Sequence, residues 1–370
     1  MSYLSMRRLV LAGAGISLVM GVALIPLVGN ASTKSKAPPG SAVTSIHFTK
    51  AEVQATKRYW TPARMRAAKP MDLLQVRGTP AKGAAAAAPT GAPGAIAPTG
   101  GRTAGAPALG SSGASTAGFS YPAPFTRFAV RPTSLYTKYP WSVNGKVFFT
   151  QDGSNFVCSG TAVNTPNGSA VWTAGHCVAS PSTHTFDSFF EFVPAYNGNA
   201  ASCCTKGIWV ADTLAVATDW INSGDLRHDL GSAHVPISSS TGKTLVQTVG
   251  GAGFAWNQAR DQDFTDFGYP QASPFNGTSL VECNAAHAFD DTAIGGTGAA
   301  PLGIGCDMTG GSSGGSWQIT WGNNLTNTQK LVAGFVNGHN DYKYSTQPLA
   351  MYSPYFDDLA RNVLCAEGAC

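Results

Sequence analysis

Three short strings of this 370-residue chain hold side chains that together could carry out nucleophilic catalysis. His176 follows Val-Trp-Thr-Ala-Gly and precedes a cysteine, and Ser313 stands in the run Gly-Gly-Ser-Ser-Gly-Gly. Between them, the string Asp225-Leu-Arg-His-Asp229 supplies two carboxylates. A serine becomes a nucleophile when a histidine accepts its proton, and a carboxylate fixes the tautomer of that histidine. The three groups follow the chain order histidine, acid, serine.

The glycines around Ser313 suit a nucleophile. Consecutive glycines let the backbone turn tightly, which exposes a hydroxyl and presents backbone N–H groups to a developing oxyanion. The same letters fit the G-x-S-x-G elbow of α/β-hydrolases, which requires an acid and then a histidine downstream. The one histidine after Ser313 is His339, and no acidic residue lies between the two, so the hydrolase order fails.

Together these strings resemble the motifs of the chymotrypsin-like (trypsin-like) serine proteases, over about residues 120–370. Cys158-Ser-Gly-Thr-Ala-Val and the later Thr-Ala-Gly-His-Cys resemble the first barrel of that family. The string beginning at Asp229 resembles its Asp-(Ile/Leu)-Ala-Leu motif, and the glycine run resembles its nucleophile loop. The overall pattern is closer to bacterial secreted members, including relatives of the glutamyl endopeptidases, than to animal digestive enzymes.

The resemblance implies specific roles. It implies that His176, Asp229 and Ser313 form a catalytic triad, and that the N–H groups of Gly311 and Ser313 form the oxyanion hole. Asp225 stays open as the alternative acid. The resemblance implies that the chain is a serine endopeptidase that forms an acyl-enzyme and needs no cofactor. It also implies protein or peptide substrates and a monomeric state.

Many members of the family place an aspartate directly before the nucleophile, where it pairs with a new N-terminal amine after activation. This chain has Ser312 there, so we do not expect that switch.

The family also implies two disulfides, Cys158 with Cys177 and Cys283 with Cys306. All eight cysteines lie at or after Cys158, an even count that indicates an oxidising compartment. The pairing of the remaining four stays open. They are Cys203, Cys204, Cys365 and Cys370.

Substrate preference depends on fewer signals. Counting back six positions from Ser313 gives Asp307, which in trypsin-like enzymes would select Arg or Lys because an unpaired buried carboxylate needs a cation. The strand ending Asn337-Gly-His339 resembles the wall of the specificity pocket, and its histidine is an opposing candidate that would select glutamate. Relatives carry that histidine nearer to Val336. We favour a basic preference and leave acidic and apolar ones open.

The elements that must position these residues look all-β. Short runs rich in Val, Phe, Tyr, Trp and Thr alternate with Gly, Asn, Ser and Pro clusters, which is typical of a barrel or sandwich. The runs are 146–150, 157–163, 170–174, 189–193, 206–216, 244–249 and 331–336. One helix is expected near Ser353–Leu364. The resemblance implies two packed Greek-key β-barrels.

The chain before residue 120 has a different composition. Residues 1–31 read as a signal peptide, with an uncleaved membrane anchor as the alternative, so we expect secretion. Residues 32–119 read as a basic pro-segment, with one short helix, and an Ala/Gly/Pro-rich linker. Residues 1–119 carry a balance of +11 and residues 120–370 one of −7, which add to the net +4. This asymmetry predicts that the basic segment docks on the protease domain, with a solvated tail as the alternative.

Other function classes fit less well. No folded part has the dense basic face that nucleic-acid binding needs. His228, Asp229 and His234 lack a further cluster of metal ligands, so we predict no metal site. A catalytically silent barrel acting as a binding module and an esterase with the same chemistry remain the rivals, and labelling by a fluorophosphonate separates an enzyme from a binding module.

Overall fold

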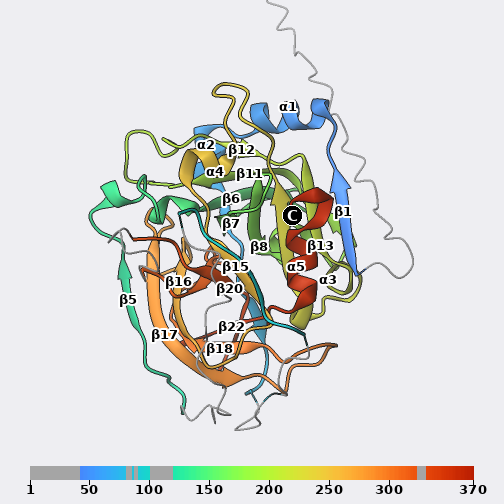
Figure 1. The fold of residues 1–370 in the computed structure, drawn as a ribbon, viewed down its shortest axis with the longest axis vertical. Helices are drawn as coiled ribbons and strands as arrows, with labels where there is room; N and C mark the ends of the chain where they lie inside the picture. Colours follow the sequence, from blue (N-terminus) through green and yellow to red (C-terminus); the bar gives the residue numbers. More distant parts are fainter. Residues whose placement is uncertain (1–41, 81–85, 87–90, 101–119, 323–330) are drawn as a thin grey trace, which may run out of the picture. The chain divides into compact units, whose positions relative to one another are not determined.

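The fold is described from a computed structural model, which covers residues 42–80, 86, 91–100, 120–322 and 331–370 (Figure 1). The predicted signal peptide or anchor, residues 1–31, and much of the predicted linker lie outside the described residues. Among the described helices, none is both long and apolar enough to cross a membrane.

The described strands form two large sheets, as the all-β prediction requires. The first has nine strands in the order β1-β13-β14-β8-β7-β6-β11-β12, with β2 added beside β7. Its members are β1 (Val43–His47), β2 (Lys69–Pro70), β6 (Asn144–Gln151), β7 (Ser154–Val163), β8 (Ala170–Ala174), β11 (Ser188–Pro194), β12 (Trp209–Val210), β13 (Thr213–Ala217) and β14 (Leu230–His234). A small hairpin of β9 (Ala179–Ser180) and β10 (Thr185–Phe186) follows β8.

The second sheet has eleven described strands, in the order β3-β21-β22-β18-β17-β16-β19-β20-β15-β4, with β5 beside β17. They are β3 (Leu74–Val76), β4 (Gly94–Ile96), β5 (Thr126–Ala129), β15 (Gly253–Trp256), β16 (Asp263–Gly268), β17 (Val281–Asp290), β18 (Leu302–Gly305), β19 (Ser316–Ile319), β20 (Phe335–His339), β21 (Tyr342–Tyr344) and β22 (Ala350–Ser353). The two curled sheets correspond to the two predicted barrels (Figure 1). Each has its own apolar core, around Trp172 in the first and Trp317 in the second.

Few helices accompany the sheets. They are α1 (Lys50–Tyr59), α2 (Pro62–Ala67), α3 (Thr218–Ser223), α4 (Leu245–Val249) and α5 (Asp358–Leu364), with single turns η1 (Thr133–Leu135), η2 (Trp141–Val143), η3 (Gly175–Cys177), η4 (Leu226–His228) and η5 (Ala366–Gly368). The predicted C-terminal helix is α5, which lies beside β13 in Figure 1. It begins at Asp358 rather than Ser353 because Ser353 is the last residue of β22 and Asp357 is the N-cap.

Some predicted strands differ from those observed. The strand expected over Thr244–Val249 is wrong, because this stretch is α4. Thr244 and Gln247 form a capping box there, which satisfies the first backbone N–H groups of a helix. The run 206–216 contains two strands instead of one, and the strand predicted at 331–336 begins only at Phe335.

Residues 42–79 are more structured than the single short helix that was predicted. β1 pairs with β13, α1 and α2 follow, β2 pairs with β7, and β3 pairs with β21. Aromatic side chains anchor the helical part: the Tyr59 ring stacks on Phe189 at 4.1 Å, and Trp60 Nε1 donates to the Phe189 carbonyl at 2.5 Å. The average composition of the segment gives little weight to these few large side chains. Their apolar contacts are nevertheless enough to order it.

Both predicted disulfides are present. Cys158 pairs with Cys177 and Cys283 with Cys306. The four cysteines that the sequence left open form two short-range bridges, Cys203 with Cys204 and Cys365 with Cys370.

Candidate active site

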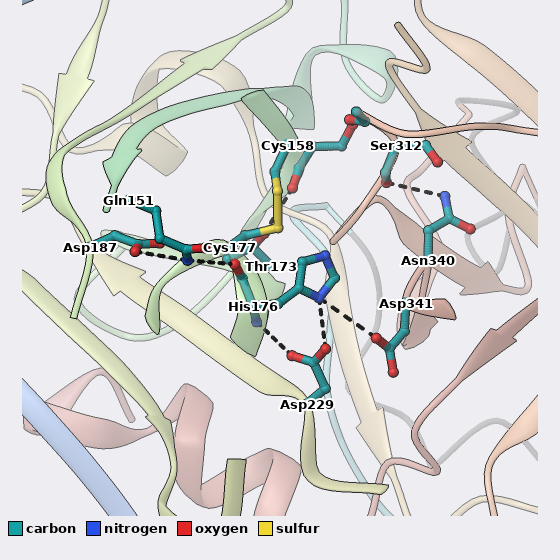
Figure 2. The surroundings of a disulfide bond; sticks show 12 residues. Gln151, Cys158, Thr173, His176, Cys177, Asp187, Asp229, Ser312, Asn340 and Asp341 are labelled. Atoms are coloured by element: carbon teal, nitrogen blue, oxygen red, sulfur yellow. Dashed lines mark hydrogen bonds and ion pairs between the residues drawn. A yellow bond between two sulfur atoms is a disulfide. The ribbon is translucent and has the colours of Figure 1, made fainter. Parts of the chain in front are cut away.

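His176 lies at the end of β8 and is only 4% exposed. Its turn is fastened to β7 by the bridge between Cys158 and Cys177 (Figure 2). Asp229 immediately precedes β14, which pairs with β8 so that Leu230 lies opposite Ala174. The pairing of these two strands therefore brings Asp229 to His176.

Two hydrogen bonds join the acid and the histidine. Asp229 Oδ1 accepts from the His176 backbone N–H at 2.6 Å, and Asp229 Oδ2 lies 2.7 Å from His176 Nδ1. Burial alone would raise the pKa of Asp229, but the charge and the hydrogen bond of His176 outweigh it and hold the pKa below its ordinary value. Asp229 is thus an ionised acceptor, which places the imidazole proton on Nδ1.

The alternative acid, Asp225, lies in another cluster. Its side chain accepts from the backbone N–H groups of Arg227 and Thr297, both at 2.9 Å, and its carboxylate is 3.7 Å from His228 Nδ1. The structure therefore brings Asp229, and not Asp225, to His176.

Ser313 comes from the second half of the chain, in the loop before β19. Two backbone hydrogen bonds hold the loop: the Ser313 carbonyl accepts from the N–H of Ser159 on β7 at 2.7 Å, and Gly314 N–H donates at 2.8 Å to the carbonyl of Asn340, which follows β20. Gly314 has φ of +75°, and an added Cβ would collide with Thr173 Oγ1 and approach Ala174 N to 2.7 Å. A glycine is thus required where the loop crosses the end of the strand that leads to His176.

The two atoms expected to exchange a proton have no hydrogen-bond partner among the described residues. His176 Nε2 and Ser313 Oγ are both buried and form no hydrogen bond. Because Nδ1 holds the imidazole proton, Nε2 has a lone pair free to accept another. The arrangement can therefore remove a proton from a hydroxyl, provided that the two groups approach each other when a substrate binds.

A segment from the N-terminal region covers the site. We call Lys69–Val76, which contains β2 and β3, the covering segment. Its Met71 N–H donates to the Val157 carbonyl at 2.9 Å, and its Met71 carbonyl accepts from Gly311 N–H at 2.8 Å. Gly311, at φ of +93°, is one of the two predicted oxyanion donors. The covering segment thus already occupies that donor, and Ser313 is 0% exposed.

Of the predicted specificity residues, Asp307 is paired within the chain. Arg127 Nε and Nη2 donate to its two oxygens, each at 3.1 Å, and its side chain is 24% exposed. The structure therefore does not supply the unpaired buried carboxylate on which the expected Arg/Lys preference rests, because a guanidinium of the chain already neutralises it.

The other two predicted specificity residues are enclosed. Asn337 Nδ2 donates to the Ala255 carbonyl at 2.9 Å. His339 is 0% exposed, and its Nδ1 lies 3.1 Å from Trp172 Nε1. Burial lowers the pKa of His339 to about 3, so it is a neutral ring packed against Trp172 and Phe356. In this position His339 is a core residue, and its ring is not exposed to bind the carboxylate of a substrate glutamate.

The three residues considered for a metal also diverge. His234 Nδ1 lies 2.7 Å from Asp212, His228 Nδ1 lies 3.1 Å from Asp219, and Asp229 binds His176. They do not share a centre.

One acidic residue was missed by the sequence analysis. Asp341 Oδ1 lies 3.7 Å from His176 Nδ1, and in Figure 2 it stands beside Asp229, facing the same imidazole nitrogen. No motif marks it: the signal available was an acid two residues after His339, at the end of a predicted strand.

Solved structures resemble this chain over most of their length. A thermostable serine protease, AL20, from an extremophilic microorganism is 35% identical, with a TM-score of 0.52, over 63% of this chain and 97% of its own. The protease Anisep from Arthrobacter nicotinovorans is 34% identical, with a TM-score of 0.54, over 66% of this chain and 99% of its own. No family model and no curated protein sequence matches the chain.

Proposed function

The chain belongs to the chymotrypsin-like serine protease family and is a serine endopeptidase, and we propose that His176, Asp229 and Ser313 are its catalytic triad. Ser313 Oγ attacks the peptide carbonyl while His176 Nε2 takes its proton. The imidazolium returns a proton to the leaving amine, and water then hydrolyses the acyl-enzyme by the same route.

The observation that carries this assignment is the pairing of His176 with Asp229. A buried carboxylate accepts Nδ1–H at 2.7 Å and the backbone N–H of the same residue at 2.6 Å. These two bonds fix both the tautomer and the orientation of the ring, and they leave Nε2 as the base. The Gly311 and Ser313 N–H groups are proposed as the oxyanion hole, since Gly311 N–H already binds a carbonyl oxygen, that of Met71.

Adjacent serines provide a matched test. Ser313→Ala should lower turnover on a protein substrate on the order of 10⁴-fold or more. Ser312→Ala is the control, because Ser312 is equally buried and its Oγ donates to the Thr309 carbonyl at 2.8 Å. We expect Ser312→Ala to keep activity within about tenfold, the loss of one neutral hydrogen bond. Near-normal turnover by Ser313→Ala would refute the assignment.

We also propose that residues 42–79 are an intramolecular pro-segment that keeps the protease latent. The support is the position of the covering segment: it pairs in parallel with β7 through β2 and with β21 through β3. Leu73 is 3% exposed and packs in the apolar cluster that contains Met308 and Cys306, beside the nucleophile loop. The opposite charge of the two parts of the chain adds attraction that salt weakens.

Latency can be tested by releasing the covering segment without cutting it. Leu73→Asp would place a carboxylate in an apolar cluster, which is costly enough to displace a short segment. Gln75→Asp adds the same charge at an exposed position of β3. On the uncut chain, we expect a fluorophosphonate to label Leu73→Asp at least about tenfold faster than wild type, and Gln75→Asp as slowly as wild type, since a tenfold gain needs little more than one kcal/mol.

Equal labelling of all three uncut chains would contradict latency. A second experiment adds the 42–79 peptide to processed enzyme at low salt. If the peptide neither binds nor inhibits the enzyme, that result would also contradict latency.

Export completes the proposal. The four disulfides of the structure are compatible with an extracellular location, where oxidation persists. We propose that residues 1–31 direct secretion.

A further inference from the structure

A second acid lies against the proposed catalytic pair. Asp229 and Asp341 are each 0% exposed. One carboxylate oxygen of Asp229, one carboxylate oxygen of Asp341 and one ring nitrogen of His176 all lie within 4.8 Å of one another. Asp341 comes from the second half of the chain, between β20 and β21, whereas His176 follows β8 and Asp229 precedes β14, two strands of the first sheet. The cluster therefore forms only when the two halves pack together.

The charges around this cluster do not balance two carboxylates. His176 faces both acids, and His339 on β20 is neutral because burial lowers its pKa to about 3. From the strands nearby, the Asp341 backbone N–H donates to the Tyr352 carbonyl and its carbonyl accepts from Leu74 N–H. The neighbouring Tyr342 hydroxyl is bonded to Asp291. Within the described residues, neither acid is paired with a lysine or an arginine.

Two buried carboxylates this close cannot both be charged, since like charges in a water-free site repel strongly. Asp229 is the one that stays ionised, because its two oxygens already accept the two bonds from His176. Burial and the charge of Asp229 raise the pKa of Asp341 well above its ordinary value. A proton is therefore retained on Asp341.

Building on the proposed triad, we propose that Asp341 is a positioning residue that holds this proton and donates a hydrogen bond to the Asp229 carboxylate. The pair then carries one negative charge. The extra donor restricts the rotation of the Asp229 carboxyl, so that Oδ1 and Oδ2 stay directed at the His176 backbone and ring while the ring gains and loses its proton.

Three variants test the role of Asp341 in the processed enzyme. Asp341→Asn keeps a donor of the same shape and cannot ionise, so we expect kcat and the acid limb of the pH profile to stay near wild type. Asp341→Ala removes the donor, and we expect kcat to fall about 10- to 100-fold with little change in KM. Ser353→Ala, a buried serine on the neighbouring β22 whose Oγ accepts from His339 N–H at 2.9 Å, controls for disturbance of this region.

The protonation of Asp341 is measured independently of catalysis. In the uncut Ser313→Ala chain, an NMR titration gives the pKa of His176 with Asp or Asn at position 341. An unchanged pKa supports a proton on Asp341. A fall of about one unit or more would show that a negative charge 3.7 Å from His176 had been removed, and would overturn the proposal.

A chelator that shifts the same titration would overturn it too, by revealing a bound cation in place of the proton. Because the titration needs no turnover, it stands even if Ser313 proves not to be the nucleophile. If Asp341→Ala does not fold, the Asn variant and the titration decide.

Discussion

Two buried clusters of this protein each place a histidine against an aspartate, yet they differ in what balances the charge. At the proposed active site, His176 Nδ1 lies 2.7 Å from Asp229, and the second neighbour of this nitrogen is another acid, Asp341. In the second sheet, His287 Nε2 lies 3.1 Å from Asp290 Oδ1. The same oxygen has a second partner, Arg260, whose Nη1 is 2.8 Å away.

The difference separates a structural ion pair from the pair that we propose for catalysis. Arg260 is permanently charged and holds Asp290 as a fixed carboxylate, so the cation that balances this acid does not titrate. Burial would raise the pKa of Asp290, but His287 and Arg260 lower it below its ordinary value. Around Asp229 the balancing cation is a titratable imidazole. The cluster proposed to move protons therefore lacks the arginine that balances Asp290.

The largest expected effect comes from removing each histidine. His176→Ala should lower kcat on a protein substrate on the order of 10⁴-fold or more, whereas His287→Ala should keep kcat within about threefold. Turnover of the two purified variants checks this. Comparable losses in both would mean that the clusters do not differ in the way described.

Removing the fixed cation should affect stability and spare chemistry. Arg260→Met leaves the buried Asp290 with His287 and the Ala86 backbone N–H as its partners, and we expect the free energy of unfolding to fall by about 3 kcal/mol with kcat unchanged. Arg361→Met, at an exposed arginine of α5, should change it by less than about 1 kcal/mol. Denaturant unfolding measures both. Equal free energies of unfolding for the two variants would contradict a structural role for Arg260.

Another buried acid, Glu191, sharpens the comparison because no lysine, arginine or histidine is paired with it among the described residues. Glu191 is 1% exposed, and burial raises its pKa from 4.5 to about 8. Between these two pH values the folded chain keeps a proton that the unfolded chain releases, so this residue makes stability fall as pH rises. The slope is at most about 1.4 kcal/mol per pH unit.

Glu191→Gln should therefore flatten the pH dependence of unfolding between pH 4.5 and 8 relative to wild type. Denaturant midpoints collected across that range would show it, and parallel curves for the two proteins would mean that Glu191 is ionised in the fold.

The clusters also show which features the sequence could predict. Cys158, His176 and Ser313 lie in contiguous strings with local signatures, so their strands and bridges were foreseen. Choosing Asp229 over Asp225 depended on a motif, and the register of β14 on β8 places it. Asp341 has no motif, since its proposed role depends on packing between two halves that are distant in sequence.

Helix capping and a few aromatic contacts were harder to predict from the sequence than these motifs. The capping box of Thr244 and Gln247 turned a strand-like run into α4. In the N-terminal region, Tyr59 and Trp60 pack against Phe189 in a segment for which the sequence predicted one short helix. Arg127 neutralises Asp307 from a strand 180 residues away, which no spacing argument could include.

The identity of the nucleophile can be measured most directly by labelling the processed enzyme with a fluorophosphonate and locating the added mass by peptide sequencing in a mass spectrometer. We expect a single adduct on Ser313, formed in step with the loss of peptidase activity and absent in His176→Ala. An adduct on another residue, or full hydrolysis by a chain that does not react with the probe, would contradict a triad of His176, Asp229 and Ser313.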